Sequence, residues 1–182
     1  MWRAVFLDRD GVLNRAPVRG GRPQSPYRAE DAELLPGVPE ACARLREAGF
    51  ALVVATNQPE VARGRLSRAT VEAIHDLLRR QLPLQDIRVC YHDDVDGCAC
   101  RKPKPGMLLA AARDLGIDLA RSFMVGDRWR DIEAGQRAGC RTVFIDHGYD
   151  ERRPEGFDFR TQSLTGAAEW ILSVVASTVP GV

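Results

Sequence analysis

The sequence predicts a doubly wound α/β fold with a mainly parallel sheet, organised as one domain over residues 1–182. Three observations support this prediction. Short apolar runs alternate with longer segments of helical periodicity along the chain. Polar residues follow several apolar runs, where open α/β sheets bind their ligands. A chain of 182 residues, 45% of them hydrophobic, can bury one core but is too short for two large domains.

Five apolar runs are predicted to form strands buried on both faces: residues 4–7, 51–55, 87–91, 123–125 and 142–145. Four helices are predicted between them, over residues 39–48, 67–80, 105–115 and 129–138. Ser67 is a candidate N-cap, and Gly49, Gly116 and Gly139 follow the other three helices as expected for C-terminal stops. A last amphipathic segment near residues 167–175 is predicted to pack a terminal helix on the sheet.

Two segments lack these periodic patterns. About residues 14–30 are rich in proline, glycine and arginine, and are predicted to form a flap or long loop over the strand ends. Residues 150–161 are polar and are expected to be irregular.

Composition excludes several classes of partner. The chain has 26 basic and 25 acidic residues, so bulk charge favours neither nucleic acid nor an anionic membrane. The apolar run before Asp8 is too short for a signal peptide, and residues 170–175 are too few to span a bilayer. We therefore expect a cytoplasmic protein without nucleic-acid or membrane partners. A monomer is expected because no large exposed apolar stripe is evident.

Asp8 and Asp10 lie two residues apart where the first predicted strand ends. Side chains at this spacing can lean to the same side of the chain, and two close carboxylates are tolerated when a divalent cation lies between them. Oxygen ligands from aspartate suit Mg²⁺. The alternative is a solvated turn that ends at Gly11. Thr56 and Asn57 after the second strand, and Asp127 after the fourth, are expected at the same sheet edge.

Four motifs then occur in order: DRDGV around Asp8, the TN pair at Thr56, RKPKPGM from Arg101, and VGD ending at Asp127. Together they resemble the four motifs of the haloacid dehalogenase superfamily of phosphatases, and they span about two thirds of the chain. The resemblance implies a Rossmann-like fold, here without a large cap domain because no insertion is available to form one.

The resemblance also implies the chemistry. Asp8 would attack phosphorus to form an aspartyl phosphate, while Asp10 would protonate the departing oxygen and later activate water. Asp10 is then expected to have a raised pKa. Mg²⁺ would be held by Asp8, the backbone carbonyl of Asp10, and Asp127, and the transferring oxygens by Thr56 and Lys102. The alternative for Lys102 is an ordinary surface lysine.

A second cluster of ligand-type residues lies in residues 90–100: Cys90, His92, Cys98 and Cys100. Three sulfurs and one imidazole suit tetrahedral Zn²⁺, and the two pairs are joined by a short turn. Because no ligand position remains open, we expect a structural zinc that staples this loop. The alternative is incidental thiols and a surface histidine. Cys42 and Cys140 are expected to be buried small hydrophobic residues.

The zinc loop followed directly by RKPKPGM resembles the D-glycero-D-manno-heptose 1,7-bisphosphate phosphatases, and also the histidinol-phosphate phosphatases that share the loop. The segments TNQ, ARG and PGM, at residues 56–58, 62–64 and 105–107, resemble the heptose enzymes. Pro59, Glu60 and Val61 depart from that family, as does Tyr91, where proline is usual. The flap is also longer and more basic than is usual in that family. The implied substrate is a small phosphorylated sugar, most specifically the heptose bisphosphate, converted to heptose 1-phosphate; histidinol phosphate is the alternative.

Four residues are predicted to bind this substrate: Asn57, Gln58, Arg101 and Arg128. The two arginines can receive a second phosphate bidentately; the alternative for each is an ordinary solvated arginine. His75 and His147 are expected to be structural and loop residues. Two non-enzymatic readings remain. One is a phospho-acceptor domain, whose acidic residue usually follows a middle strand; the other is a zinc-stapled binding module with relic motifs, although no motif is incomplete.

Overall fold

The computed structural model describes residues 1–177 and confirms the predicted fold class. Six strands form one sheet in the order β5-β4-β1-β6-β7-β8, and every neighbouring pair is parallel. The strands are β1 (Arg3–Leu7), β4 (Phe50–Asn57), β5 (Asp86–Cys90), β6 (Phe123–Gly126), β7 (Arg141–Ile145) and β8 (Phe159–Thr161). From β1 the chain moves outward to β4 and β5, then crosses back to β6, so the strand order reverses beside β1.

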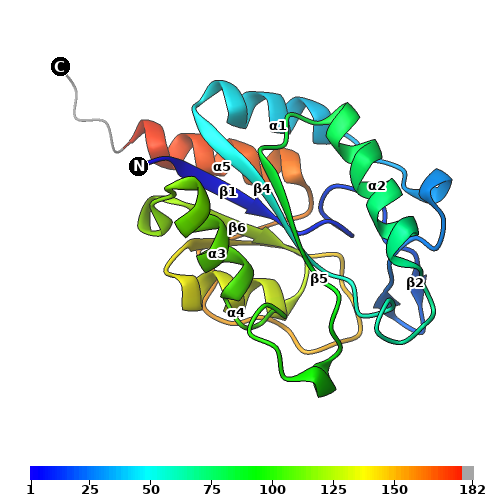
Figure 1. Ribbon diagram of the computed structural model, residues 1–182. Coiled ribbons are helices and arrows are strands. Elements are labelled where there is room, and N and C mark those ends of the chain that lie inside the picture. The colour runs from blue at the N-terminus through cyan, green and yellow to red at the C-terminus, as the bar shows by residue number, and fades with distance from the viewer. Residues whose placement is uncertain (178–182) are drawn as a thin grey trace.

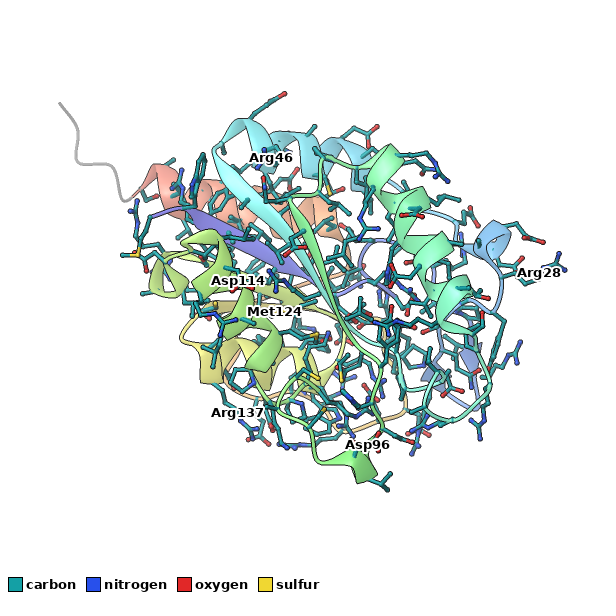
Figure 2. All side chains as sticks on the ribbon, viewed as in Figure 1. Arg28, Arg46, Asp96, Asp114, Met124 and Arg137 are labelled. Carbon is teal, nitrogen blue, oxygen red and sulfur yellow. The ribbon has the colours of Figure 1, made fainter. Side chains whose placement is uncertain are left out.

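Helices cover both faces of this sheet (Figure 1). They are α1 (Val38–Glu47), α2 (Arg68–Gln81), α3 (Gly106–Leu115), α4 (Trp129–Ala138) and α5 (Leu164–Ala176). One apolar layer joins the sheet to α1, α2 and α5, and a second joins it to α3 and α4. Met124, labelled in Figure 2, belongs to the second layer, whereas Arg28 projects outward beside the short helix η1 (Ala29–Asp31).

Helix boundaries agree with the sequence prediction to within a few residues. The Ser67 hydroxyl accepts a hydrogen bond from the Thr70 backbone N–H and caps α2. Gly116 and Gly139 adopt left-handed backbone conformations, with φ of 65° and 84°, directly after α3 and α4. These are the C-terminal stops that the glycine positions predicted.

Three expectations about the strands are wrong. The third predicted strand, β5, is not buried on both faces, because it forms an edge of the sheet and pairs only with β4 among the described residues. The second predicted strand, β4, continues through Thr56 and Asn57 rather than ending before them. Residues 150–161 are not irregular throughout, because β8 pairs with β7 and Phe159 stacks on Trp170 at a centroid distance of 5.0 Å.

The predicted flap contains a small hairpin. Its strands β2 (Val18–Arg19) and β3 (Arg22–Pro23) are joined by Gly20 and Gly21, whose φ angles of 57° and 73° suit a type I′ turn. The Gly21 carbonyl accepts a hydrogen bond from the Asp150 N–H at 3.0 Å, which ties the hairpin tip to the loop after β7.

The topology places the polar residues of the motifs together. Asp8 follows β1, Thr56 lies at the end of β4, and Asp127 follows β6, so all three stand at the carboxyl ends of adjacent parallel strands. This is the switch point at which open α/β sheets bind ligands. Within residues 1–177, none of the helices has the length and apolar character needed to cross a bilayer.

Candidate active site and zinc centre

Lys102 is the centre of the buried charges at the switch point. Its side chain is only 2% exposed, so the interpretation as a surface lysine is wrong. Its Nζ donates hydrogen bonds to Asp8 Oδ1 at 2.9 Å and to the Ala55 carbonyl at 2.7 Å, and lies 2.6 Å from Asp131 Oδ1. Burial lowers the pKa of Lys102, but Asp131 and Asp8 raise it by more, so the net shift is upward. Lys102 is therefore a permanent cation here.

Asn57 fixes the backbone that carries this lysine. Its side-chain Nδ2 donates to the Lys102 carbonyl at 3.0 Å, and its Oδ1 accepts from the Lys102 N–H at 3.1 Å. The pair of bonds joins β4 to a segment 45 residues further along the chain. Asn57 also lines the cleft described below, so its predicted substrate contact stays a prediction, while its observed role is to position Lys102.

Asp8 and Asp131, which contact Lys102, lie close to Asp127 in an arrangement that suits a metal ion. One oxygen from each of Asp8, Asp127 and Asp131 lies within 4.8 Å of the others. Both oxygens of Asp127 are buried without a well-formed hydrogen bond within residues 1–177, and the nearby Tyr149 hydroxyl only partly offsets the burial that raises the Asp127 pKa. Buried carboxylate oxygens without donors are costly unless a cation compensates them. The residues therefore fit Mg²⁺, which prefers oxygen ligands.

The sequence reasoning missed Asp131. It lies in the first turn of α4, where its Oδ2 accepts a hydrogen bond from the Arg128 N–H at 3.0 Å. An aspartate four residues after Asp127, at the start of a predicted helix, was the available signal. Gly126 shows how tightly this turn is packed, because a β-carbon there would lie 2.0 Å from the Asp131 Cβ.

Mg²⁺ affinity is expected to weaken as the pH falls. Burial raises the pKa of Asp8, Lys102 opposes this and Asp131 adds to it, and the result is about 6. Burial, Asp8 and Asp131 likewise raise the pKa of Asp127. Below pH 6 the Asp8 carboxyl holds a proton that the metal must displace, and the raised pKa of Asp127 acts in the same direction, so the Mg²⁺ Kd should rise at least about tenfold between pH 7.5 and pH 5. Calorimetric titration measures this, and equal Kd values at the two pH values would contradict it.

Asp10 is surrounded by hydrogen-bond donors. Its Oδ1 accepts from Arg9 Nε at 3.1 Å and Asn14 Nδ2 at 2.9 Å, and its Oδ2 accepts from Arg9 Nη2 at 2.9 Å, Ser25 Oγ at 2.7 Å and Gln58 Nε2 at 3.0 Å. Burial raises the pKa of Asp10, but Arg9 and the other donors lower it by more, and the net pKa lies below its ordinary value. The expectation of a raised pKa is wrong for this structure, which holds the ionised form.

Gln58 lies behind the site rather than at its surface. Its side chain is buried, and its Nε2 donates to Thr56 Oγ1 at 2.9 Å as well as to Asp10. Its predicted substrate contact stays a prediction; the structure places it as an orienting residue for Asp10 and Thr56. Ser25, which the sequence reasoning also missed, brings the flap to the same carboxylate.

A polar cleft opens above these groups, between the flap, the segment after β4 and the zinc loop. Asp8, Asp10 and Lys102 line it, and six arginines surround them: Arg22, Arg63, Arg65, Arg101, Arg128 and Arg130. The two arginines predicted for a second phosphate are thus both in the cleft.

Both of these arginines already have acidic partners. Arg101 Nε donates to Asp94 Oδ1 at 2.8 Å, and Arg128 Nε donates to Glu151 Oε1 at 2.9 Å. Arg101 is only 8% exposed, and most of Arg128 is also shielded, so neither is an ordinary solvated arginine. His147 lies nearby as well, with Nε2 2.7 Å from the Gly11 carbonyl, where it can support the loop after β1.

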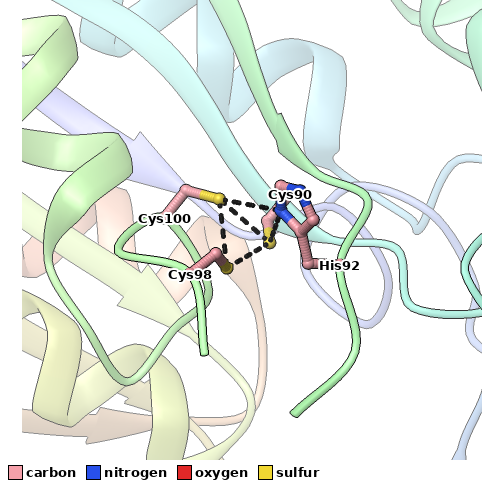
Figure 3. A group of neighbouring side chains, drawn as sticks. All are labelled: Cys90, His92, Cys98 and Cys100. Atoms are coloured by element: carbon pink, nitrogen blue, oxygen red, sulfur yellow. Dashed lines mark hydrogen bonds between the residues drawn. The ribbon is translucent and has the colours of Figure 1, made fainter. Parts of the chain in front are cut away.

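The predicted zinc ligands converge (Figure 3). The sulfur of Cys90 lies 3.7 Å from that of Cys98 and 3.2 Å from that of Cys100, and the last two are 3.4 Å apart. His92 Nδ1 lies 3.7 Å from the Cys90 sulfur and 3.4 Å from the Cys100 sulfur. A tetrahedral ion with Zn–S bonds of about 2.3 Å separates its sulfurs by about 3.8 Å. The cluster has the composition and nearly the spacing of a zinc site.

Comparison with known proteins adds three findings. A family model described as haloacid dehalogenase-like hydrolase matches residues 15–139. The D-glycero-beta-D-manno-heptose-1,7-bisphosphate 7-phosphatase of Bordetella bronchiseptica is 40% identical over 181 residues, covering 93% of this chain and 98% of that protein. The D-glycero-alpha-D-manno-heptose-1,7-bisphosphate 7-phosphatase of Campylobacter jejuni is 35% identical over 161 residues, covering 87% of this chain and 88% of that protein.

A solved structure is similar over nearly the same length. The D,D-heptose 1,7-bisphosphate phosphatase of B. bronchiseptica, crystallised with magnesium and phosphate, superposes with a TM-score of 0.80 at 36% identity. The match covers 94% of this chain and 99% of that one.

Proposed function

The chain belongs to the haloacid dehalogenase-like hydrolase family, and from this premise we propose that it is a magnesium-dependent phosphatase that hydrolyses a phosphorylated sugar. The observation that carries the proposal is the buried cluster of Asp8, Asp127, Asp131 and Lys102 at the floor of an arginine-rich cleft. A phosphate monoester is the ligand class that such a cleft suits, because it presents charged oxygens to cations and a phosphorus to a carboxylate.

Asp8 is the proposed nucleophile. Lys102 holds its Oδ1, which directs the other oxygen toward the substrate phosphorus. Attack forms an acyl phosphate bond between an Asp8 oxygen and phosphorus, and breaks the bond from phosphorus to the sugar oxygen. Lys102 and Thr56 bind the transferring oxygens. Asp8, Asp127 and the backbone carbonyl of Asp10 would hold Mg²⁺, which would neutralise charge on the transferring phosphate, while Asp131 supports Lys102 and lies close to the Asp8 and Asp127 carboxylates.

Asp10 is the proposed acid and base. Its lowered pKa means that the free protein holds the carboxylate, the form that removes a proton from the water that hydrolyses the intermediate. An anionic phosphate bound close by raises the pKa of a carboxyl group. We therefore expect proton uptake by Asp10 on substrate binding, which provides the acid for the departing sugar oxygen.

The Cys90, His92, Cys98 and Cys100 cluster is proposed to hold a structural zinc. Its loop contains the short helix η2 (Asp94–Asp96), whose Asp94 binds both Arg101 and Arg130 at the cleft. Two residues after the last ligand comes Lys102. A closed zinc site would therefore hold the cleft wall and the lysine backbone in place rather than take part in chemistry.

A heptose 1,7-bisphosphate losing its 7-phosphate is the proposed substrate. The names of the B. bronchiseptica and C. jejuni relatives support this class, and they differ in the anomer. Arg101 and Arg128 in the cleft support recognition of a second phosphate, which would compete with Asp94 and Glu151 for the guanidinium groups.

The test is phosphate release with Mg²⁺ from both anomers of heptose 1,7-bisphosphate, histidinol phosphate and simple sugar monophosphates. We expect kcat/KM for one bisphosphate anomer to exceed that for each monophosphate at least tenfold, which is about 1.4 kcal/mol of transition-state discrimination. A preference for histidinol phosphate would replace the substrate assignment. No release from any ester would reject the phosphatase itself.

A further inference from the structure

Arg9 is buried completely, although it lies between two polar motif residues in a loop. Its Nε and Nη2 donate to the two oxygens of Asp10, so the guanidinium binds the carboxylate bidentately. A planar guanidinium bound in this way fixes the orientation of a carboxylate as well as its charge.

The remaining guanidinium nitrogen points at a helix. Arg9 Nη1 lies 3.2 Å from His75 Nε2, and His75 is fully buried on α2, 66 residues away in sequence. Arginine only donates hydrogen bonds, so Nε2 must be the acceptor, and the ring proton must reside on Nδ1. His75 is therefore neutral. Its burial and the Arg9 cation lower its pKa to about 4, in agreement with this tautomer.

Within the described residues, the imidazole of His75 makes no hydrogen bond as short as the one with Arg9. Its Nδ1 makes no hydrogen bond within the described residues, and Glu72 Oε1 lies 3.7 Å away, too far for one. Glu72 instead accepts a hydrogen bond from the Tyr91 hydroxyl. Burying a polar ring costs free energy that a hydrophobic side chain of similar size would not, and the hydrogen bond from Arg9 offsets part of this cost.

We infer that Arg9 and His75 form a buried pair that positions the catalytic Asp10. In this pair, His75 accepts a hydrogen bond from the arginine that binds the Asp10 carboxylate. The inference rests on the proposed function, because it concerns the acid of that reaction. His75 touches no reacting atom and acts only through Arg9. Removing the acceptor leaves Arg9 Nη1 buried without a partner, so the guanidinium shifts and Asp10 loses its fixed orientation.

Loss of this orientation has a signature that depends on the leaving group. A sugar alkoxide needs a proton from Asp10 as its bond to phosphorus breaks, whereas a nitrophenolate is stable enough to leave without one. kcat/KM reports steps up to the first irreversible one, here transfer to Asp8. A misplaced acid should therefore lower kcat/KM for a sugar phosphate much more than for p-nitrophenyl phosphate.

The experiment compares His75→Leu, His75→Gln and Ile74→Ala with the wild type on both substrates, with Mg²⁺ and bound zinc retained. Leucine removes the acceptor, whereas the glutamine Oε1 can replace Nε2. Ile74 is the matched control, because it is buried on the same helix and has no polar group. We expect His75→Leu to lower kcat/KM for the sugar phosphate about 10- to 100-fold and for the aryl phosphate less than about threefold.

We expect His75→Gln to recover most of that loss, and Ile74→Ala to lower the melting temperature without changing the ratio of the two kcat/KM values. Equal losses on both substrates, no loss, or no recovery by glutamine would overturn the positioning role. If the wild type itself released no phosphate from either ester, the proposed phosphatase function would be rejected, and the inference with it.

Discussion

Replacing Asp8 with asparagine is expected to reduce kcat for phosphate release by at least about a thousandfold, because an amide oxygen cannot form the covalent intermediate. The change is nearly isosteric, and Lys102 can still donate to the remaining oxygen, so binding of the substrate should survive. Phosphate release and substrate affinity, measured separately, test this. A variant that retained a tenth of the wild-type kcat would exclude Asp8 as the nucleophile.

The same substitution has a stability signature that distinguishes it from misfolding. The pKa of Asp8 is raised to about 6 in the fold, against 3.8 for an ordinary aspartate, so its ionised form is disfavoured by folding. The wild type without metal thus loses stability as the pH rises from about 4 to about 6, and asparagine removes this loss. The variant should be at least as stable as the wild type at pH 7.5. The exposed Asp76→Asn is the matched control, with activity unchanged.

Removing a zinc ligand is expected to have the largest effect on stability. Cys98→Ser should lose the bound zinc, and because a structural zinc contributes about 10 kcal/mol or more of apparent binding free energy, losing even half of this would lower the Tm by about 10 °C or more. Phosphatase activity should fall as well, since Arg101 and Lys102 directly follow Cys100. Metal analysis, thermal unfolding and kcat/KM are the three measurements.

Cys42→Ala is the matched control for the zinc prediction. Cys42 is also buried, but it lies on α1, far along the chain from the ligands, and its replacement should leave the zinc content at one ion per chain. Purified wild-type protein that lacks zinc and yet unfolds at the same temperature after zinc is added would contradict the structural role.

The site residues that could be predicted from the sequence are those whose role is indicated by adjacent residues in the chain. Asp8, Thr56 and Asp127 follow apolar runs, and topology then brings the ends of those runs together. The zinc ligands were recognisable because all four fall in one short segment. The regular helices were predictable for a related reason, since glycine and serine mark their ends locally.

Residues that owe their role to distant contacts were not predictable in this way. Asp131 matters because Lys102 reaches it across the site, and Ser25 because the flap folds over Asp10. The lowered pKa of Asp10 depends on Arg9, whose direction no local pattern reveals. The short strand β8 likewise forms only through pairing with β7, and three residues are too few to give a periodic signal.

The hairpin of the flap is fixed at two places, because its tip bonds the loop after β7 and Ser25, two residues beyond β3, bonds Asp10. Its tip is tied to the loop after β7 through Gly21, whereas Asp8 and Asp127 follow the central strands β1 and β6, and Lys102 precedes α3. A change in the length or charge of the hairpin tip that leaves Ser25 on Asp10 can therefore reshape the entrance while the carboxylates and lysine keep their geometry. Substrate specificity can in this way change from one phosphorylated metabolite to another while the catalytic mechanism stays the same.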